Sequence, residues 1–561
     1  MALSNPVRNV PAAPAPRRAG AGLGTGAGLT LLCVLALLPV ASLVWLALAG
    51  AVWGDGTASV WRHLLANVLP RVAGDTGLLL LGVGIGTTLA GAGTAWLVAL
   101  HDFPGRRALA LLLPLPLAVP TYVAAYCWVE WLDHAGPVQT LARDWTGLRL
   151  GGVPDVRSLW GGILVFTFVL YPYVHLPCRL LFASQGASQL DAARSLGQSG
   201  RGLLMRVGLP LARPAVAGGV ALALMETLND IGAVEALGVR TVTFAVFETW
   251  LNRDSLQGAV QLALVAVAVV VALVWLERTG RAGRRYTSAR TRPPGRIALS
   301  GAGGIGAATA CALPVLLGLG IPCAVLLPYA ARRLEQFVEP RLLGALWGSV
   351  TISTLTSVLC VAVAFGVLEV SRLSRRSGWA TAGRLATLGY AIPGTVLAIG
   401  VLVPFAAFDN ALDGWLERTL GLRSGLLLTG SLAALVYACT LRALAVAWGP
   451  IEAGHARLSP RIDMAARTLG RDGTAIAREV HLPVLLPVLG AGGLMVFIDT
   501  MKELPATLLL RPFGFETVAT LVYDRATQEA LEDAAAASLV TILVGLISVA
   551  AVSRLARAER R

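Results

Sequence analysis

The chain has 561 residues, of which 56% are hydrophobic and only 14% are charged. With a mean hydropathy of +0.70, this composition excludes a string of soluble domains and indicates a polytopic membrane protein. The net charge of +14 would suit a nucleic-acid-binding protein, but the arginines gather in alternate connections between apolar runs, so the charge reports membrane topology and no nucleic-acid partner is predicted.

Twelve apolar runs, each long enough to cross roughly 30 Å of hydrocarbon, follow one another along the chain. Backbone groups in lipid must be satisfied within the segment, so these runs predict helices and an all-α polytopic fold surrounded by membrane lipid. The first run is longer than the core of a cleavable signal peptide, and we expect it to be retained. The runs lie near 29–50, 76–100, 108–130, 160–182, 212–236, 257–276, 297–328, 346–368, 385–408, 425–448, 484–510 and 534–553.

The placement of arginine predicts the orientation of these helices. Arginine-rich connections alternate with connections that are balanced or acidic, and the positive-inside rule puts the former in the cytoplasm together with both termini. The arginine-rich segments are 106–107, 194–206, 278–296, 372–384, 457–478 and 554–561.

The sequence contains an internal repeat. "AARSLGQSG" at 192–200 returns as "AARTLGRDG" at 465–473, and at the same offset "AVPTYVA" at 118–124 falls on "AIPGTVLA" at 391–398. We expect the register to slip between about 130 and 190. Each copy contains an even number of spans, which predicts two parallel six-helix repeats with the same orientation.

This repeat predicts the organisation of the chain. A cytoplasmic tail covers 1–28, a first transmembrane domain 29–277, a cytoplasmic linker 278–296 and a second transmembrane domain 297–561. Each domain includes a long cytoplasmic loop, at 183–210 and 449–483. Helix formers, a glycine and a second short helical stretch precede a proline in both loops, so each is predicted to be a protruding helix-turn-helix that ends where the next span begins.

The two loops resemble the EAA loop of ABC importer permeases, in which Glu-Ala-Ala, three residues and Gly are followed by Leu-Pro. The resemblance implies that each loop forms a coupling helix in a groove of a cytoplasmic ATPase. Asp191 replaces the usual Glu, and Met464 replaces the acid outright with Asp463 one position earlier, so we expect the second loop to grip its ATPase differently. The residues that match the motif are Asp191, Ala192, Ala193 and Gly197 in the first loop and Met464, Ala465, Ala466 and Gly470 in the second.

A narrower resemblance concerns the substrate. Segments 223–250 and 497–523 are similar to the corresponding parts of fused two-domain ferric-iron permeases. This resemblance implies a type I ABC importer permease in a bacterial inner membrane, driven by a homodimer of an ATP-binding subunit and fed by a periplasmic or other extracytoplasmic binding protein. Ferric iron is the predicted substrate; fused permeases for thiamine, polyamines or phosphonates share the architecture, and a secondary transporter with parallel repeats is a further alternative.

The sequence predicts no enzyme activity for this chain. A P-loop needs Gly-Lys-Ser/Thr, but the only lysine, Lys502, stands in "MKEL", so ATP hydrolysis is assigned to a separate subunit. The cysteines and histidines lack the spacing of a metal site. No catalytic residue, metal site or cofactor of its own is therefore predicted.

Four carboxylates are predicted inside the membrane. Asp499 aligns with Glu226 and Glu503 with Asp230, so each half is expected to carry two acids four residues apart on one face of its fifth helix. An unpaired charge at the bilayer centre costs at least about 2.5 to 3.5 kcal/mol. Two interpretations stay open: the four acids and Lys502 line a translocation path that suits a hard cation, or they form a structural network in which Lys502 neutralises Asp499.

Overall fold

A computed structural model describes residues 22–53, 57–146, 155–184, 193, 195–198, 200–281, 295–374 and 377–558. Nearly every regular element in these ranges is a helix, which confirms the predicted all-α class; the exceptions are the two-residue strands β1 (His101–Asp102) and β2 (Ile297–Ala298), which pair in parallel. Most of the predicted N-terminal tail and of the linker, and the motif residues Asp191 and Ala192, lie outside the described residues.

The helices fall into two series, called here the first half and the second half. The first half contains α1 (Gly22–Trp53), α2 (Thr57–His63), η1 (Leu64–Val68), α3 (Leu69–Leu100), α4 (Arg106–Leu112), η2 (Leu115–Ala118), α5 (Thr121–Leu132), α6 (Pro137–Thr146), α7 (Leu159–Leu170), α8 (Pro172–Ser184), α10 (Gly200–Leu203), η3 (Leu204–Gly208), α11 (Leu209–Asn229), α12 (Ile231–Ala236), α13 (Val242–Leu251) and α14 (Leu256–Arg281). The second half contains α15 (Gly301–Val315), η4 (Leu316–Gly320), α16 (Ile321–Arg332), η5 (Leu334–Val338), α17 (Pro340–Ser374), α18 (Ser377–Ala386), η6 (Thr387–Ala391), α19 (Gly394–Leu420), α20 (Leu432–Arg457), α21 (Pro460–Thr468), α22 (Gly473–Ala475), η7 (Ile476–His481), α23 (Leu482–Met501), α24 (Pro505–Leu510), α25 (Val518–Thr527) and α26 (Leu531–Ala558).

Among the described residues, nine helices are long and apolar enough to cross a membrane, and two bent helix pairs bring the number to as many as eleven. α26 coincides with the twelfth predicted run. The run at 108–130 is not one helix, because the chain turns by 98° between η2 and α5. Pro120 lacks the amide hydrogen that a continuous helix needs, and Val119 before it is extended, as residues before proline usually are.

Proline also shapes four of the spans, at or near the start of three of them and in the middle of Gly301–Arg332. η1, η3, η4 and η7 are π-helical turns of five or six residues, and each leads into an α-helix with proline at its first or second position. A proline without an amide hydrogen cannot join the ordinary ladder, and the wider i→i−5 turn accommodates it. The expected helix break at the prolines that follow the two coupling loops is therefore a π turn, and η3 and α11 form one continuous span.

The repeat is visible in the helix boundaries. α5 and α19, α7 and α20, and α11 and α23 begin 273 positions apart. The expected register slip between about 130 and 190 is wrong for the helices, because α7 lies in that segment and keeps the offset. The offset first changes after α11 and α23: α24 begins 274 positions after α12, and α25 begins 276 positions after α13.

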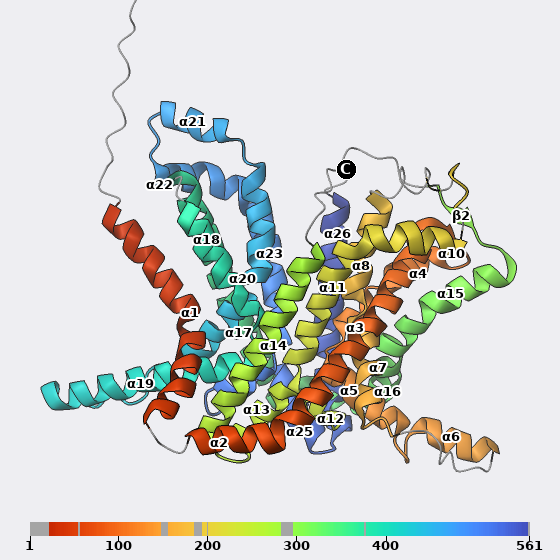
Figure 1. Ribbon diagram of the computed structural model, residues 1–561, viewed down its shortest axis with the longest axis horizontal. Helices are drawn as coiled ribbons and strands as arrows, with labels where there is room; N and C mark the ends of the chain where they lie inside the picture. The colour runs from red at the N-terminus through yellow and green to blue at the C-terminus, as the bar shows by residue number, and fades with distance from the viewer. Residues whose placement is uncertain are drawn as a thin grey trace, which may run out of the picture.

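The first helices of the two halves cross over to the opposite half. α1 contacts α18 and α19, and α16 contacts α5 as well as α26; Figure 1 shows α1 beside α18 and the outward-running α19. The Ser42 hydroxyl donates to the Gly400 carbonyl at 2.7 Å. The largest buried apolar cluster likewise combines α5, α7 and α12 with α16, α24, α25 and α26, so the halves share one core.

Gly400 permits the close approach of α1 to α19. A Cβ at this position would lie 2.6 Å from the Pro39 carbonyl oxygen, whereas a Cβ at Gly490 would meet nothing within 4 Å. We expect Gly400→Leu to lower the stability of the protein by about 1–3 kcal/mol through overpacking, measured by denaturant titration in detergent micelles. Gly490→Leu is the matched control; equal losses in both variants would contradict this role of Gly400.

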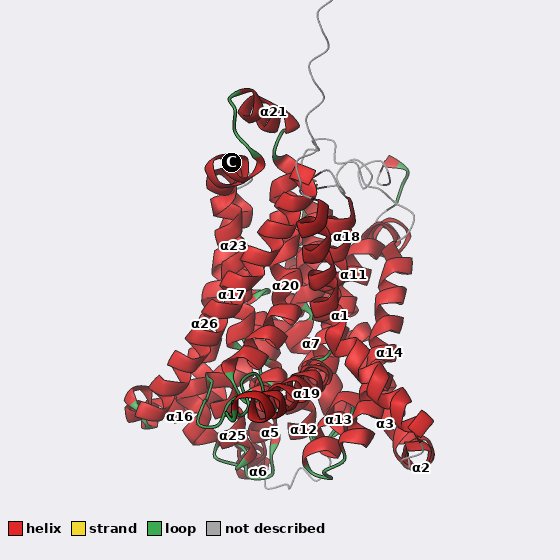
Figure 2. Ribbon diagram, turned by 90° about the vertical axis from the view of Figure 1, so that its left-hand side faces the viewer, coloured by secondary structure: helices red, strands yellow, loops and turns green. Residues whose placement is uncertain are grey.

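The connections gather at two ends of the helix bundle. α4, α10, α18 and α21 lie at one end, and α2, α6, α12 and α25 lie at the other (Figures 1 and 2). We call these the α21 end and the α25 end. The described arginine-rich connections are at the α21 end, so the charge pattern from which orientation was predicted belongs to one surface.

Candidate functional site

The structure brings all five predicted intramembrane residues to one cavity. Glu226, Asp230, Asp499, Lys502 and Glu503 line a space of about 60 Å³ between the two halves. A cavity needs roughly 10–15 Å³ to hold one water molecule, so this space admits a few waters or a small ion.

The acids of each pair do not lie on one helix face, and that prediction is wrong. α11 ends at Asn229 and α23 ends at Met501, so the second acid of each pair stands in the break that follows. Asp230 Oδ1 accepts the Ala233 amide at 2.8 Å, and Glu503 Oε1 accepts the Ala506 amide at 3.1 Å. Amides in the first turn of a helix lack intrahelical partners, and these carboxylates supply them for α12 and α24.

The residues at the break after α11 also make hydrogen bonds to the first residues of α5 and α19. Asp230 Oδ2 accepts a hydrogen bond from the Thr121 hydroxyl at the start of α5. Asn229 Oδ1 accepts the Gly394 amide at the start of α19, at 2.7 Å. A Cβ at Gly394 would lie 3.0 Å from Pro505 Cβ. Helix ends of both halves therefore meet at the cavity, where their amide dipoles favour negative charge.

Arg442, on α20, is the cation that pairs with these acids. Its guanidinium contacts Glu503, and its Nη2 lies 3.9 Å from Glu226 Oε2. In the described part of the chain no carboxylate lies within 4.0 Å of the Lys502 ammonium, so the expected Lys502–Asp499 pair is not formed. α23 ends at Met501, and Lys502 leaves the helical geometry that would place it over Asp499.

Sequence reasoning missed Arg442, although a signal was present. Arg442 is the only charged residue in the apolar run 425–448, and intramembrane charges are rare and face the protein interior. Tyr390 was missed as well; its hydroxyl donates to Glu226 Oε1 at 2.9 Å. Both residues belong to the second half and Glu226 to the first, so these contacts hold the halves together across the cavity.

The charges around the cavity do not cancel. Four carboxylates face only two cations, Arg442 and Lys502, so the ionised set carries a formal charge of −2. Arg442, Lys502 and the amides at the helix ends place positive charge at the same cavity.

The two EAA-like loops, at the α21 end, each contain a turn of the same geometry. Ala193 and Ala466 are buried, and in each loop the amide five residues further along donates to the carbonyl of that alanine, at 3.0 and 3.1 Å. Gly197 and Gly470 have φ of 82° and 77°, a left-handed conformation that glycine adopts without strain. The repeated motif thus encodes the same loop geometry twice.

Each turn presents an exposed leucine that sequence reasoning did not single out. Leu196 and Leu469, which precede the two glycines, are 82% and 80% exposed. Met464, on α21, is also exposed. The signal was available, because leucine precedes the glycine in both copies of the motif. Two large apolar side chains at equivalent positions outside the membrane-spanning helices are typical of a contact surface.

Asp463 does not stand in for the acid missing at Met464. Its carboxylate turns inward, with Oδ2 2.9 Å from Arg372 Nε and Oδ1 2.9 Å from His481 Nε2. Partial burial would raise the pKa of Asp463, but its hydrogen bonds to Arg372 and His481 hold that pKa below its ordinary value. Asp463 therefore makes contacts within the protein and does not present its carboxylate at the surface of the loop.

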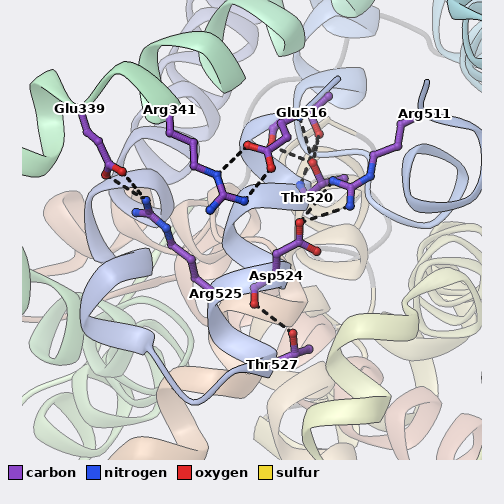
Figure 3. Close-up of polar contacts among 9 residues, drawn as sticks. Glu339, Arg341, Arg511, Glu516, Thr520, Asp524, Arg525 and Thr527 are labelled. Atoms are coloured by element: carbon purple, nitrogen blue, oxygen red, sulfur yellow. Dashed lines mark hydrogen bonds and ion pairs between the residues drawn. The ribbon is translucent and has the colours of Figure 1, made fainter. Parts of the chain in front are cut away.

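An ion-pair network fixes the loop before α25 at the opposite end. Figure 3 shows Arg341, at the start of α17, donating from Nε and Nη2 to Glu516 at 2.9 and 2.6 Å. The bond from Arg341 holds the pKa of Glu516 below its ordinary value, against the opposite effect of burial. Arg525 pairs with Glu339. Phe513, at the tip of this loop, is fully exposed, so a rigid base presents an aromatic ring.

These features define a membrane transport protein: two repeats of membrane-spanning helices, charged residues at their shared centre and paired loops at one end. Residues 87–277 match the family described as "Binding-protein-dependent transport system inner membrane component". The chain is 30% identical over 259 residues to a "Probable molybdenum ABC transporter permease protein" of Haloferax volcanii, which covers 45% of this chain and 89% of that protein.

Two longer matches cover most of the chain. An "Fe(3+)-transport system permease protein" of Haemophilus influenzae is 25% identical over 496 residues, 86% of this chain and 89% of its own length. A "Thiamine transport system permease protein" of Salmonella typhimurium is 26% identical over 458 residues, 79% and 81% of the two chains. The chain belongs to the family of inner-membrane components of binding-protein-dependent transport systems, and it is the multi-pass permease of an ABC importer.

Proposed function

We propose that this permease imports ferric iron. The observation that carries the proposal is the excess of carboxylates at the cavity between the halves, since Glu226, Asp230, Asp499 and Glu503 face only Arg442 and Lys502. Carboxylate oxygens suit hard, highly charged cations. Molybdate and sulfate, which relatives of this family carry by name, are anions and would be repelled by the same charges.

The path we propose runs through the cavity and is closed by contacts between the halves. Arg442 and Tyr390 reach across to Glu226, so separation of the halves would remove both contacts and expose the carboxylate. Asp230 and Glu503 keep their capping bonds to α12 and α24 during this change. In this scheme Glu226 and Asp499 meet the passing cation, and Arg442 restores the closed state.

The remaining parts of the transporter follow from the family and from the two ends of the bundle. We place the α21 end and both termini in the cytoplasm, as the positive-inside rule predicts. Residues 29–277 and 297–561 are the two transmembrane domains, and each EAA-like loop binds one subunit of a homodimeric ATPase that hydrolyses ATP. The binding protein docks at the α25 end, where the loop that carries Phe513 is held by ion pairs.

The ligand of the cognate binding protein tests the substrate. Titration calorimetry of that protein with ferric citrate, thiamine and molybdate is expected to show binding of iron alone. Thiamine is the second candidate, because it is also a cation and because the thiamine permease matches most of the chain. Binding of molybdate without iron would refute the charge argument.

Lys502 offers a test of the path within the membrane. Its first-half counterpart is Asn229, and the described structure gives its ammonium no carboxylate within 4.0 Å. We expect Lys502→Asn to leave assembly and stability nearly unchanged, within about 1 kcal/mol, and to alter the rate of iron uptake because it adds to the excess negative charge. Loss of assembly, assayed by gel filtration in detergent, would instead support a structural strut.

A further inference from the structure

The second coupling segment, α21, is joined to the helix bundle by charged side chains that are partly or fully buried. Asp463 on α21 accepts hydrogen bonds from Arg372 of α17, with Nε at 2.9 Å and Nη2 at 3.1 Å. Its Oδ1 lies 2.9 Å from Nε2 of His481, which is fully buried in η7 directly before α23. One carboxylate therefore ties α21 to two membrane-spanning helices.

The chain of contacts continues inward through His481. Its Nδ1 lies 2.9 Å from Glu369 Oε2, and Glu369 Oε1 lies 2.9 Å from Nε2 of His455 on α20. Glu369 and His455 are also buried. We call Arg372, Asp463, His481, Glu369 and His455 the polar joint; it links α21 to α17, α20 and α23.

The polar joint needs protons on both histidines. His481 has a carboxylate at each ring nitrogen, and His455 has Glu369 at Nε2 and the Ile451 carbonyl at Nδ1, 3.0 Å away. A neutral imidazole has one donor and one acceptor, while the imidazolium has two donors. While Glu369 and Asp463 are ionised, only the doubly protonated rings satisfy all four contacts, since a neutral ring would set a nitrogen lone pair against an oxygen.

At the five counterpart positions the first half has no titratable residue. Trp96 meets Phe182 edge-on at a centroid distance of 5.3 Å, and a Cβ at Gly208 would lie 2.4 Å from the Trp96 ring. These three residues stand 273 positions before Glu369, His455 and His481, and the counterparts of Arg372 and Asp463 are also apolar. The first-half residues at the five positions are Trp96, Ala99, Phe182, Leu190 and Gly208.

Stability alone does not explain why the second half has charged residues at positions where the first half has apolar ones. Replacing a buried ion-pair cluster with well-packed apolar residues is often neutral or stabilising, and the first half shows that this fold accepts the apolar version. A buried polar cluster is better explained by a role in registry or switching.

We propose that Glu369, Asp463 and His481 are positioning residues that keep α21 in register with α17, α20 and α23, and that this registry requires protonated histidines in the second half only. The inference rests on the proposed coupling of α21 to the ATPase. Movement of α21 then reaches the helices through the polar joint while the histidines are charged, and the joint loosens when they lose their protons. The charged groups that face the two histidines are Glu369, Asp463 and Arg372.

The test transplants the apolar joint. A variant with Glu369→Trp, Arg372→Ala, His455→Phe, Asp463→Leu and His481→Gly is reconstituted with the ATPase and binding protein, and iron imported per ATP hydrolysed is measured from about pH 6 to about pH 9. We expect this ratio to fall about tenfold with rising pH in the wild type and to stay flat in the variant. A second variant, His481→Gln, removes the imidazole with one substitution and is expected to flatten the profile as well.

Two controls make the outcome decisive. His63→Gln removes an exposed histidine on α2 and is expected to keep the wild-type profile. If the wild type transports with a ratio independent of pH, or if His481→Gln keeps the wild-type profile, the inference is overturned. Absence of ATP-driven uptake in the wild type at every pH would refute the proposed function instead.

Discussion

Arg442→Met is expected to lower the free energy of unfolding by about 3–5 kcal/mol, because it leaves buried Glu503 without its cation. Glu226 loses the same partner, so we also expect iron uptake to fail. The measurement is unfolding of the purified protein in mixed micelles, followed by tryptophan fluorescence. This is the largest single-residue effect that the structure predicts.

The control for Arg442 is an arginine whose ion pair lies in solvent. Arg423 pairs with Glu417, but their side chains are 76% and 47% exposed, and Arg423→Met is expected to cost at most about 1 kcal/mol. The double variant Arg442→Met/Glu503→Gln removes the unpaired charge and keeps an oxygen for the Ala506 amide. We expect it to be more stable than Arg442→Met; equal stability would mean that the two side chains are not coupled.

Leu196→Asp combined with Leu469→Asp is expected to abolish coupling to the ATPase. Both leucines are exposed at the tips of the EAA-like turns, and placing a charge in an apolar groove weakens binding by at least about tenfold at each site, or 1.4 kcal/mol. Co-purification of the ATPase with the tagged permease measures the effect, and the deletion of residues 192–197 should reproduce it.

A leucine elsewhere on the surface provides the comparison. Leu422, in the connection after α19, is 62% exposed, and Leu422→Asp is expected to leave ATPase binding intact. If the double variant at the turns still retains the ATPase and transports at the wild-type rate, the two loops are not the coupling elements.

The sequence was sufficient to predict the class of fold and the location of the site. Hydropathy predicted the spans, and the repeat placed Glu226 opposite Asp499 and Asp230 opposite Glu503, all of which line the cavity. Periodicity could not reveal that α11 and α23 end before Asp230 and Glu503, because an apolar run reads as one helix until a capping contact is seen. Thr121 and Gly394, which lie far away in sequence, make hydrogen bonds to Asp230 and Asn229 at the end of α11.

Spacing along the sequence does not identify Arg442 as the partner of the acids. A Lys502–Asp499 pair is one interpretation that closeness in sequence allows, whereas the structure pairs Arg442 with Glu503 across 61 positions. The same limit applies to Asp463, whose partners Arg372 and His481 come from α17 and η7. Local spacing relates residues only within a continuous helix, whereas contacts between helices depend on the fold.

The duplication explains why the two halves differ where they do. Most of their backbone elements keep one offset, yet particular charged residues have no counterpart in the first copy: Arg442 stands where the first half has Val169, and His481 where it has Gly208. A single chain that carries both copies can specialise them, which identical subunits cannot do. The first half supplies an apolar joint and the second a charged one.

Uptake of radioactive iron into proteoliposomes tests the central claim most directly. The permease is reconstituted with its ATPase, and the iron-loaded binding protein is added on the side of the α25 end. We predict uptake that requires both ATP and the binding protein and that persists when ionophores collapse every ion gradient. Uptake that continues without ATP and stops when the gradients are collapsed would contradict the account and identify a secondary transporter.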